Sequence, residues 1–339
     1  MPNMTGYVLL TILAGSTFFS CRAMLVFKNP WEYGPLGETV NGLTEEEMSA
    51  KAREVAGKLG YDIISLNTKH INYTIPYSAV AECDGAKIEV LDDGKIILYL
   101  TPEKGDFSKE IEKLKDYADF TIIFEGYGSE NIDGTNYQYG LPLPDGYRFV
   151  YYNMTYKEAL KTTKYLFSKY GAFSGIKSPG YNLFAHYTYA GDFGRLYTTV
   201  FENKGSLKQR ILNYHFNNLS FSATDLGGLS GISRKKFDLS QKIGDYPIIT
   251  AAKARKLLLK RHYITSVPEE LPGEEYIARV TLVYRTSRWD KVIMPYYKFF
   301  VEIPSGQMEN GLKTFGTFYV PAVKSEYLEN IPLWDGSIN

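Results

Sequence analysis

The chain has 339 residues, enough for two domains or for one long core. Its 38 Lys and Arg balance its 38 Asp and Glu, so the chain lacks the basic excess expected of a nucleic-acid-binding protein. Tyrosine is enriched, with 29 Tyr beside 19 Phe and 3 Trp, and this favours a β-rich protein with large sheet faces. Exposed rings of this kind would also give a platform on which sugars or peptides dock.

The first 21 residues predict export. The segment from Gly6 to Phe19 carries no charge and is too short to span a bilayer comfortably, but it suits the apolar part of a signal peptide. Ser20 and Cys21 follow it, and this arrangement resembles the lipobox of bacterial lipoproteins, in which the cysteine is lipidated and becomes the mature N-terminus. The resemblance implies a signal peptide over residues 1–20 and a lipidated N-terminus with a tether over residues 21–42. A buried N-terminal strand or helix and an uncleaved signal anchor are the alternatives that stay open.

Residues 43–245 predict an N-terminal region in which helices alternate with strands. Thr44 and Glu47 have the spacing of a capping box, which predicts a helix that ends near Leu59. Thr155 and Glu158 repeat this spacing and predict a helix to about Tyr170. Between these helices the sequence predicts a hairpin of Ala86–Leu91 and Lys95–Leu100 around Asp92-Asp93-Gly94, a short helix over Phe107–Tyr117 and a strand at Phe120–Phe124.

The second half of this region predicts a meander of three strands, at Tyr181–Tyr189, Arg195–Glu202 and Lys208–Phe216. Residues 223–247 are rich in Gly, Ser, Asp and Lys, so they predict a loop or a domain boundary. Gly227-Gly228-Leu229-Ser230-Gly231 falls in this segment. It lacks the final glycine of a Gly-x-Ser-x-Gly nucleophile motif and is interpreted as a flexible loop.

Residues 246–339 predict a C-terminal module that consists of one helix and a sheet. The helix follows Thr250 and runs to about Tyr263, and strands are expected at Glu275–Arg285, Val292–Ile303 and Leu312–Val320. Tyr297, Phe299 and Val301 alternate with polar residues, which predicts an antiparallel sheet with one face on a helix and one towards water. Because a helix followed by a meander is expected at least twice, the predicted fold class is α+β with repeated helix-plus-meander units.

The segment from Ile249 to Ile303, with its strand Tyr296-Tyr-Lys-Phe-Phe-Val-Glu-Ile303, resembles a PepSY-type module. Modules of that family pack a short helix on an antiparallel sheet, and Thr44–Leu100 matches them in outline. Tandem modules occur in the YycH and YycI regulators, which are anchored at the membrane of Gram-positive bacteria. The resemblance therefore implies a non-catalytic protein that binds or restrains a partner at the outer face of the membrane.

Sequence motifs for chemistry are weak. The four histidines form no metal-binding pattern and Cys83 has no cysteine near it, so no metal site, cofactor or catalytic centre is predicted. His186 and His215 are expected in strands that lie near each other, which leaves a Ser–His pair open. Asp133-Gly134-Thr135-Asn136 is interpreted as a turn. Lys253 to His262 predicts an amphipathic helix with a solvated basic face, and contact with anionic headgroups is the alternative.

These patterns together favour a non-catalytic, extracytoplasmic binding or regulatory lipoprotein anchored through Cys21, whose partner is an envelope protein or a glycan. The alternative is a cell-envelope glycan hydrolase or glycan-binding protein that uses tyrosine platforms and paired carboxylates. Glu125, at the end of an apolar strand, is the acid that such a site would use first.

Overall fold

The structure of this chain is a computed structural model. It describes residues 24–28, 42–69, 78–101, 107–132, 134–150, 154–187, 194–265, 267, 269–285, 292–306 and 315–329. The predicted signal peptide over residues 1–20, Cys21 and most of the predicted tether lie outside the described residues. Within that tether, Met24–Lys28 form the strand β1.

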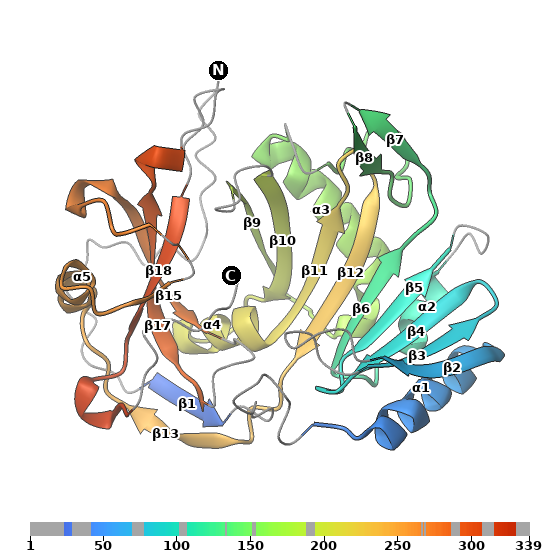
Figure 1. Cartoon of the computed structure of the whole chain (residues 1–339), viewed down its shortest axis with the longest axis horizontal. Helices are drawn as coiled ribbons and strands as arrows, with labels where there is room; N and C mark the ends of the chain where they lie inside the picture. The colour runs from blue at the N-terminus through green and yellow to red at the C-terminus, as the bar shows by residue number, and fades with distance from the viewer. Residues whose placement is uncertain are drawn as a thin grey trace. The chain divides into compact units, whose positions relative to one another are not determined.

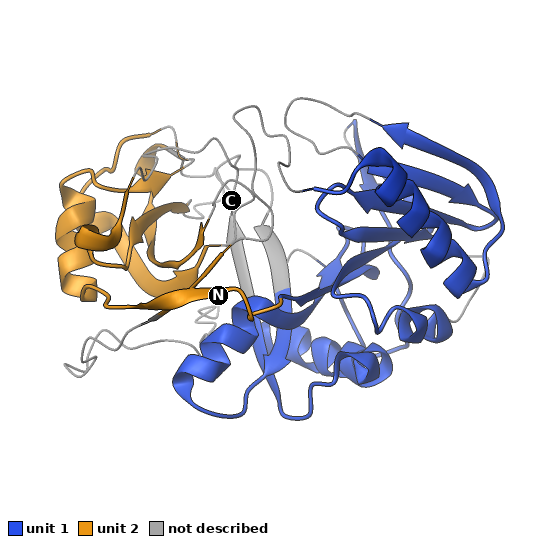
Figure 2. Ribbon diagram, turned by 90° about the horizontal axis from the view of Figure 1, so that it is seen from below, with its two compact units in different colours: residues 1–9, 34–185, 195–237 blue, residues 10–33, 186–194, 238–339 orange. Residues whose placement is uncertain are grey.

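The chain divides into two compact units (Figure 2). Unit 1 takes residues 1–9, 34–185 and 195–237, and unit 2 takes residues 10–33, 186–194 and 238–339. The strand β13 (Lys242–Tyr246), at the end of the predicted N-terminal region, belongs to unit 2.

Unit 1 is built on a nine-stranded sheet with the order β2-β3-β4-β5-β6-β12-β11-β10-β9 (Figure 1). The strands are β2 (Ile63–Lys69), β3 (Ser78–Cys83), β4 (Ala86–Leu91), β5 (Ile96–Leu100), β6 (Asp119–Phe124), β9 (Pro179–Tyr187), β10 (Gly194–Glu202), β11 (Asn217–Ala223) and β12 (Leu229–Lys236). The pairs from β2 to β10 are antiparallel except β5 and β6, which run parallel. A parallel pair needs a crossover connection, and α2 (Ser108–Lys113) lies in it. A separate hairpin of β7 (Ser129–Ile132) and β8 (Thr135–Gln138) turns at Gly134, next to Asp133, which is outside the described residues.

The helix α1 (Glu45–Leu59) begins at the predicted capping box. Thr44 Oγ1 accepts a hydrogen bond from the Glu47 backbone N–H at 3.2 Å, and the Thr44 N–H donates to the Glu47 carboxylate at 2.8 Å. The helix ends at Gly60, whose φ of +82° favours glycine. Its buried residues Met48, Ala52, Val55 and Leu59 lie on the predicted stripe, and the helix packs on β3 and β4. The prediction of this helix is confirmed.

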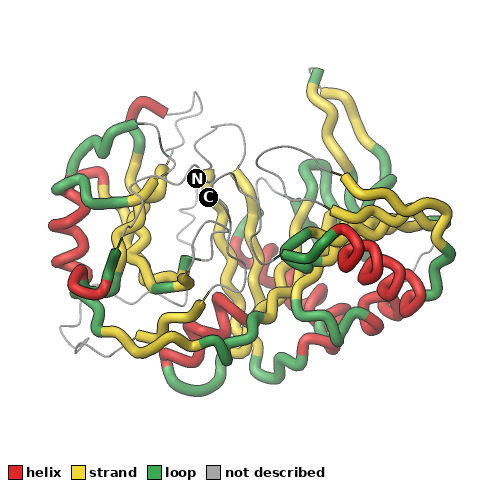
Figure 3. The backbone as a smooth tube through the Cα atoms, turned by 60° about the horizontal axis from the view of Figure 1, so that its bottom comes forward, coloured by secondary structure: helices red, strands yellow, loops and turns green. Residues whose placement is uncertain are grey.

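The helix α3 (Tyr156–Tyr170) starts in the same way, with Thr155 and Glu158 as its capping box. Together with α1 and α2, it shares one hydrophobic core with a single face of the sheet (Figure 3). Alternate strand residues supply that face, among them Ile88, Leu98, Ile122, Leu219 and Ile232, all fully buried. Burial of each such aliphatic side chain stabilises the fold by about 1.5–3 kcal/mol.

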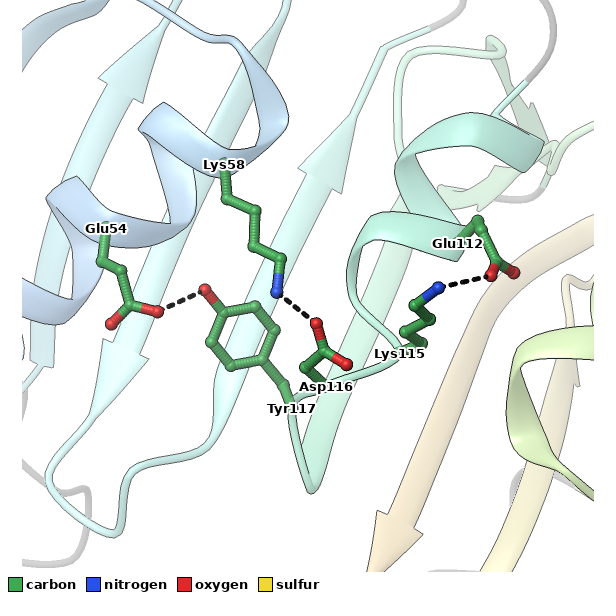
Figure 4. Close-up of polar contacts among 6 residues, drawn as sticks. All are labelled: Glu54, Lys58, Glu112, Lys115, Asp116 and Tyr117. Atoms are coloured by element: carbon green, nitrogen blue, oxygen red, sulfur yellow. Dashed lines mark hydrogen bonds and ion pairs between the residues drawn. The ribbon is translucent and has the colours of Figure 1, made fainter.

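A network of polar side chains joins α1 to the segment that follows α2 (Figure 4). Lys58 Nζ lies 2.8 Å from Asp116 Oδ2, and the Tyr117 hydroxyl donates to Glu54 Oε1 at 2.8 Å. Lys58 Nζ also lies 4.8 Å from the centroid of the Tyr117 ring. Because Asp116 and Glu54 are exposed, solvent screens the charges and the ion pair adds little stability, so the network mainly fixes the edge of the helical layer.

Unit 2 contains a four-stranded antiparallel sheet, order β14-β18-β17-β15, and a three-stranded sheet, order β13-β1-β16. The remaining strands are β14 (Ile264–Thr265), β15 (Ile277–Tyr284), β16 (Val292–Ile293), β17 (Pro295–Glu302) and β18 (Phe315–Pro321). The helix α5 (Ala251–Leu259) begins behind Thr250, as predicted, and Ala254 and Leu258 are its buried residues. The Tyr297 hydroxyl donates to Ile249 O at 2.8 Å, which holds the sheet at the start of the helix.

The alternation predicted for β17 is confirmed, because Tyr297, Phe299 and Val301 are buried whereas Lys298 and Glu302 are only half-buried. This strand carries most of the Tyr296–Ile303 motif within the segment that resembles a PepSY module. It lies between β15 and β18, in the middle of the sheet. The resemblance itself stays a prediction.

The predicted fold class, α+β with repeated helix-plus-meander units, is wrong. The described part of the chain is mostly β: strands account for 43% of it and helices for 27%, and the strands form four sheets. The strand groups of unit 1 do not form separate meanders, because β6 pairs with β5 on one side and with β12 on the other. A continuous sheet therefore replaces the expected repeats.

Two segments account for further errors. The predicted strand Lys208–Phe216 lies in the helix α4 (Leu207–Phe216), where Ser206 Oγ accepts from the Gln209 N–H at 3.2 Å and so caps the first turn. Residues 223–247, predicted as a loop or a domain boundary, hold β12 and β13, and unit 1 passes into unit 2 between Phe237 and Asp238. Gly231 lies in β12. A Cβ at this position would lie 2.7 Å from Ile122 O, so glycine is needed where β12 and β6 approach closely.

Candidate functional site

One face of the nine-stranded sheet carries the core, and the other carries polar side chains together with the apolar residues Ile97, Ile123 and Phe201. We call the second one the polar sheet face and define it by Lys87, Glu89, Tyr99, Asp119, Thr121, Thr199, Asn218, Ser220, Ser222, Ser233 and Lys235, which alternate with core residues along β4, β5, β6, β10, β11 and β12. Thr199, for example, lies between the buried residues Thr198 and Val200. The members of this face are half-buried, apart from Glu89, which is 8% exposed.

Four hydroxyl side chains form a straight row across the middle of this face. The register of the strands places Thr121 opposite Ser233, Ser233 opposite Ser220, and Ser220 opposite Thr199. Thr121 Oγ1 and Ser233 Oγ lie 3.0 Å apart. Because neighbouring strands are about 4.8 Å apart, the row presents hydroxyl groups at a regular spacing. Each hydroxyl both donates and accepts, so the row suits a polar ligand that lies across the strands.

A second row of small residues runs beside the first. Ser222 lies opposite Gly231, and Ser230 Oγ donates to Ser222 Oγ at 2.9 Å. On the far side of Gly231 the row continues with Ile123 of β6, so the small residues end there. Neither row was predicted from the sequence, because the first depends on the register between β6 and β12, which are far apart in the chain, and the second on the register between β11 and β12.

Glu89, Tyr99 and Lys87 form one corner of the face. The Tyr99 hydroxyl donates to Glu89 Oε2 at 3.0 Å, and Lys87 Nζ lies 3.7 Å from the centroid of the Tyr99 ring. Burial and the neighbouring Glu89 carboxylate raise the pKa of Tyr99 above its ordinary value, so the hydroxyl stays protonated and keeps donating. Because the lysine covers the ring, Tyr99 does not offer that side to a sugar.

Lys235 and Asp119 form the opposite corner, where they face each other on β12 and β6. Burial lowers the pKa of Lys235 to about 8, against the opposing effect of the Asp119 carboxylate. Burial also raises the pKa of Asp119, although Lys95 and Lys235 act the other way. Both groups are thus shifted towards their neutral forms, which is a feature of functional sites and of buried ion pairs alike.

Glu125, the acid selected from the sequence, follows β6 and is exposed. Its backbone N–H donates to Leu100 O at 2.9 Å, and its carboxylate contributes to the raised pKa of Tyr99. Glu89 is the buried acid next to that hydroxyl, and it was not predicted from the sequence. The signal was present in β4, where Lys87 and Glu89 alternate with the apolar residues Ile88 and Val90.

Of the two histidines expected in neighbouring strands, only His215 has a described side chain. His215 lies on the helix α4, with its ring centroid 4.7 Å from that of Tyr214, so the expectation that it lies in a strand is wrong. His186 lies in β9, but its side chain is outside the described part of the structure, and His70 is outside it altogether. His262 is exposed beyond α5. Among the described residues no group of three or more His, Cys, Asp and Glu side chains could hold a metal ion.

Gly227 and Gly228 allow close packing of the backbone before β12. The Gly228 N–H donates to Phe149 O at 2.9 Å, and the Gly140 N–H donates to Gly227 O at 3.0 Å. Three chain segments therefore cross at this point with almost no space between their backbones. The glycines provide close packing and positive φ angles, and the interpretation as a flexible loop is wrong for this motif because β12 begins at Leu229.

The remaining sequence features are structural as well. Cys83 is buried at the end of β3. The basic residues Lys253, Arg255, Lys256 and Lys260 are exposed along α5, which confirms the predicted solvated basic face. Tyr139 and Tyr156 of unit 1 and Tyr327 of unit 2 are exposed.

Comparison with other proteins gives no relative: no known family, curated protein or solved structure matches the chain. In the described part of the chain, no helix has the length and apolar character needed to cross a membrane.

Proposed function

We propose that this chain is a non-catalytic binding protein of the extracytoplasmic face of the membrane, anchored by a lipid on Cys21, and that the polar sheet face is its binding surface. The observation that carries the binding part is the hydroxyl row Thr121–Ser233–Ser220–Thr199 on four adjacent strands. A row of neutral donors and acceptors suits recognition better than bond cleavage, which needs a nucleophile with a positioned base.

The anchoring part rests on the uncharged segment before Cys21 and has a geometric consequence. Met24, the first residue of β1, comes three residues after Cys21, and three residues span at most about 11 Å. A lipid on Cys21 would therefore keep β1 and its partner β13 close to the headgroups. Lys28, Lys242 and Ile243 are exposed on these two strands, and they have the character of residues that tolerate a membrane surface.

A glycan is the second candidate ligand, and the acids near Tyr99 are the observation that favours it. Glu89 and Glu125 both act on the Tyr99 hydroxyl, and two carboxylates are what a glycoside hydrolase needs. The covered Tyr99 ring favours hydrogen-bonded recognition of a glycan over stacking.

The binding surface is tested by photocrosslinking in the cells that produce the protein. A photoreactive phenylalanine analogue at Ser220, in the hydroxyl row, should give a discrete adduct with a partner. The same analogue at Lys157, exposed on α3, should give none. Equal adducts from both positions, or none from Ser220 in a variant that still folds, would contradict the proposed surface.

A further inference from the structure

Lys235 lies in surroundings that neighbouring strands and a helix supply. It faces Asp119 on β6 and Asn218 on β11, and its Nζ lies 4.7 Å from the centroid of the Phe237 ring. Phe237 in turn packs edge-on against Phe216 of α4, with ring centroids 5.6 Å apart. The amine thus combines an apolar wall, one carboxylate and an amide, and its side chain is half-buried.

Burial lowers the pKa of Lys235 more than the neighbouring carboxylate raises it. Asp119 attracts the ammonium form, whereas Lys95, which precedes β5 beside Asp119, repels it. Further away, Asp93 and Lys51 act on Asp119 and not directly on Lys235. Lys51 is held by the backbone, since its Nζ donates to Gly94 O at 2.7 Å, and Asp93 accepts from the Lys95 N–H at 2.9 Å.

We propose that the Lys235 amine binds a carbonyl-bearing ligand covalently, as an imine, at this corner of the polar sheet face. The inference deepens the proposed function and rests on it, because it assigns the ligand class of the same surface. The amine attacks the carbonyl carbon of an aldehyde or ketone, and the carbinolamine loses water to give the imine. Asp119, which faces Lys235 on the neighbouring strand, takes up the amine proton and returns it to the departing hydroxyl.

The neutral amine is the form that reacts, and burial supplies it. With the pKa of Lys235 lowered to about 8, roughly 9% of the amine is neutral at pH 7. An exposed lysine with the ordinary value of 10.5 is neutral to only about 0.03%. The hydroxyls of Thr121 and Ser233, further along the same strands, would hold the polar part of the ligand next to the bond.

The test uses benzaldehyde with cyanoborohydride on the purified full chain, followed by peptide mass mapping at each lysine. At pH 7 and limiting benzaldehyde, Lys235 should be modified at least tenfold faster than the exposed Lys157, because its roughly 300-fold larger neutral fraction outweighs the weaker nucleophilicity of a less basic amine. The rate at Lys235 should level off above pH 8, while that at Lys157 should keep rising. Equal rates at the two lysines in the folded chain would overturn the proposal.

Two variants make the test specific. Lys235→Arg keeps a cation opposite Asp119 and should lose only this adduct. Asp119→Asn removes the attraction for the ammonium form, so the midpoint of the Lys235 pH profile should move to lower pH; an unchanged midpoint would show that the corner does not control the amine. The outcome is independent of the crosslinking at Ser220. Adducts at Ser220 without selective Lys235 labelling would reject the imine alone, and the reverse result would reject the partner-binding surface alone.

Discussion

Several tyrosine hydroxyls of this protein donate hydrogen bonds at the ends of packed rings. They donate to Glu89 from Tyr99, to Glu54 from Tyr117, to Ile249 O from Tyr297 and to Leu25 O from Tyr284. Burial is the first cause of the raised pKa of Tyr61, to about 12, and it also raises the pKa of Tyr99 and Tyr117. These three hydroxyls therefore stay protonated at physiological pH. The tyrosine enrichment thus serves the sheets and their edges, in agreement with the structural explanation offered by the sequence.

At the same scale, Cys21→Ala tests the anchor. If Cys21 carries the lipid, the variant should leave the membrane fraction and lose incorporation of a labelled fatty acid, because no other acyl attachment is proposed. Cys83→Ala is the matched control, since the Cys83 thiol is buried in β3, and this variant should stay with the membrane. Unchanged membrane association of Cys21→Ala would remove the lipoprotein proposal while leaving the polar sheet face untouched.

At the scale of the elements, local signals decided which predictions succeeded. The helices α1, α3 and α5 begin after Thr44, Thr155 and Thr250 because each threonine hydroxyl accepts a backbone N–H three residues on. The hairpin of β4 and β5 is equally local, with Asp92-Asp93-Gly94 as its turn and the Asp93 side chain accepting from Lys95. These elements could be predicted because a few adjacent residues fix them.

The elements that were predicted wrongly have either an ambiguous local sequence or a structure that depends on distant strands. The cap of α4 at Ser206 directly follows Gly205, so the segment resembles a turn that leads into a strand. β12 contains the closely packed Gly231 and several polar residues, and only its neighbours β6 and β11 show which of them face the core. Arg234 illustrates this, because it is 4% exposed on the core side and donates to Phe173 O at 3.2 Å.

The capping box of α3 gives the element-scale prediction. Thr155→Ala should lower the free energy of unfolding by about 1 kcal/mol at pH 7, because the Glu158 N–H loses its acceptor. Hydrogen bonds from the Thr155 backbone and hydroxyl hold the pKa of Glu158 below its usual range. A carboxyl group whose pKa is lower in the folded than in the unfolded chain stabilises the fold at pH values above the unfolded pKa of about 4.3. This stabilisation is lost as the pH falls through the folded pKa.

The difference between wild type and Thr155→Ala in urea titrations should therefore shrink below about pH 4, and only slightly, because the carboxylate is screened by solvent. Thr155→Ser keeps the hydroxyl and is the control, which should unfold as the wild type does. A difference that grows at low pH would show that the box is not the source of the stability.

At the scale of the whole molecule, the sheet of unit 1 depends on contacts that no local pattern announces. Thr121 and Ser233 meet because β6 lies between a strand that precedes it in the chain and one that comes about a hundred residues later. The candidate site inherits this property. Its residues are mostly Ser, Thr, Lys and Glu, and they become neighbours only through the register of the strands. The buried face of β17 could therefore be predicted from the alternation in its sequence, but the polar sheet face of unit 1 could not.

The crossing of three segments at Gly228 is where this long-range order is most constrained. A Cβ at Gly228 would lie 2.7 Å from the carbonyl carbon and oxygen of Gly140, both backbone atoms, and the φ of Gly228 is +108°. Gly228→Ala should destabilise unit 1 by at least about 2 kcal/mol, since it combines backbone strain with a clash that no side-chain rotation relieves. The Leu141–Leu229 bridge, with its two hydrogen bonds of 2.9 Å, would break first.

Gly57→Ala is the matched control in the same unit. Gly57 lies in α1 with an ordinary φ and no atom within 4 Å of an added Cβ, so alanine there should stabilise the protein by about 0.5–1 kcal/mol. Urea unfolding followed by circular dichroism measures both variants. Opposite signs would show that the glycines of this chain divide into those required by close packing and those that are merely tolerated. If Gly228→Ala were as stable as the wild type, the three segments would not cross as tightly as described. The assignment of Leu229 as the first residue of β12 would then be in error, because the backbone at Gly228 sets the direction in which that strand enters the sheet.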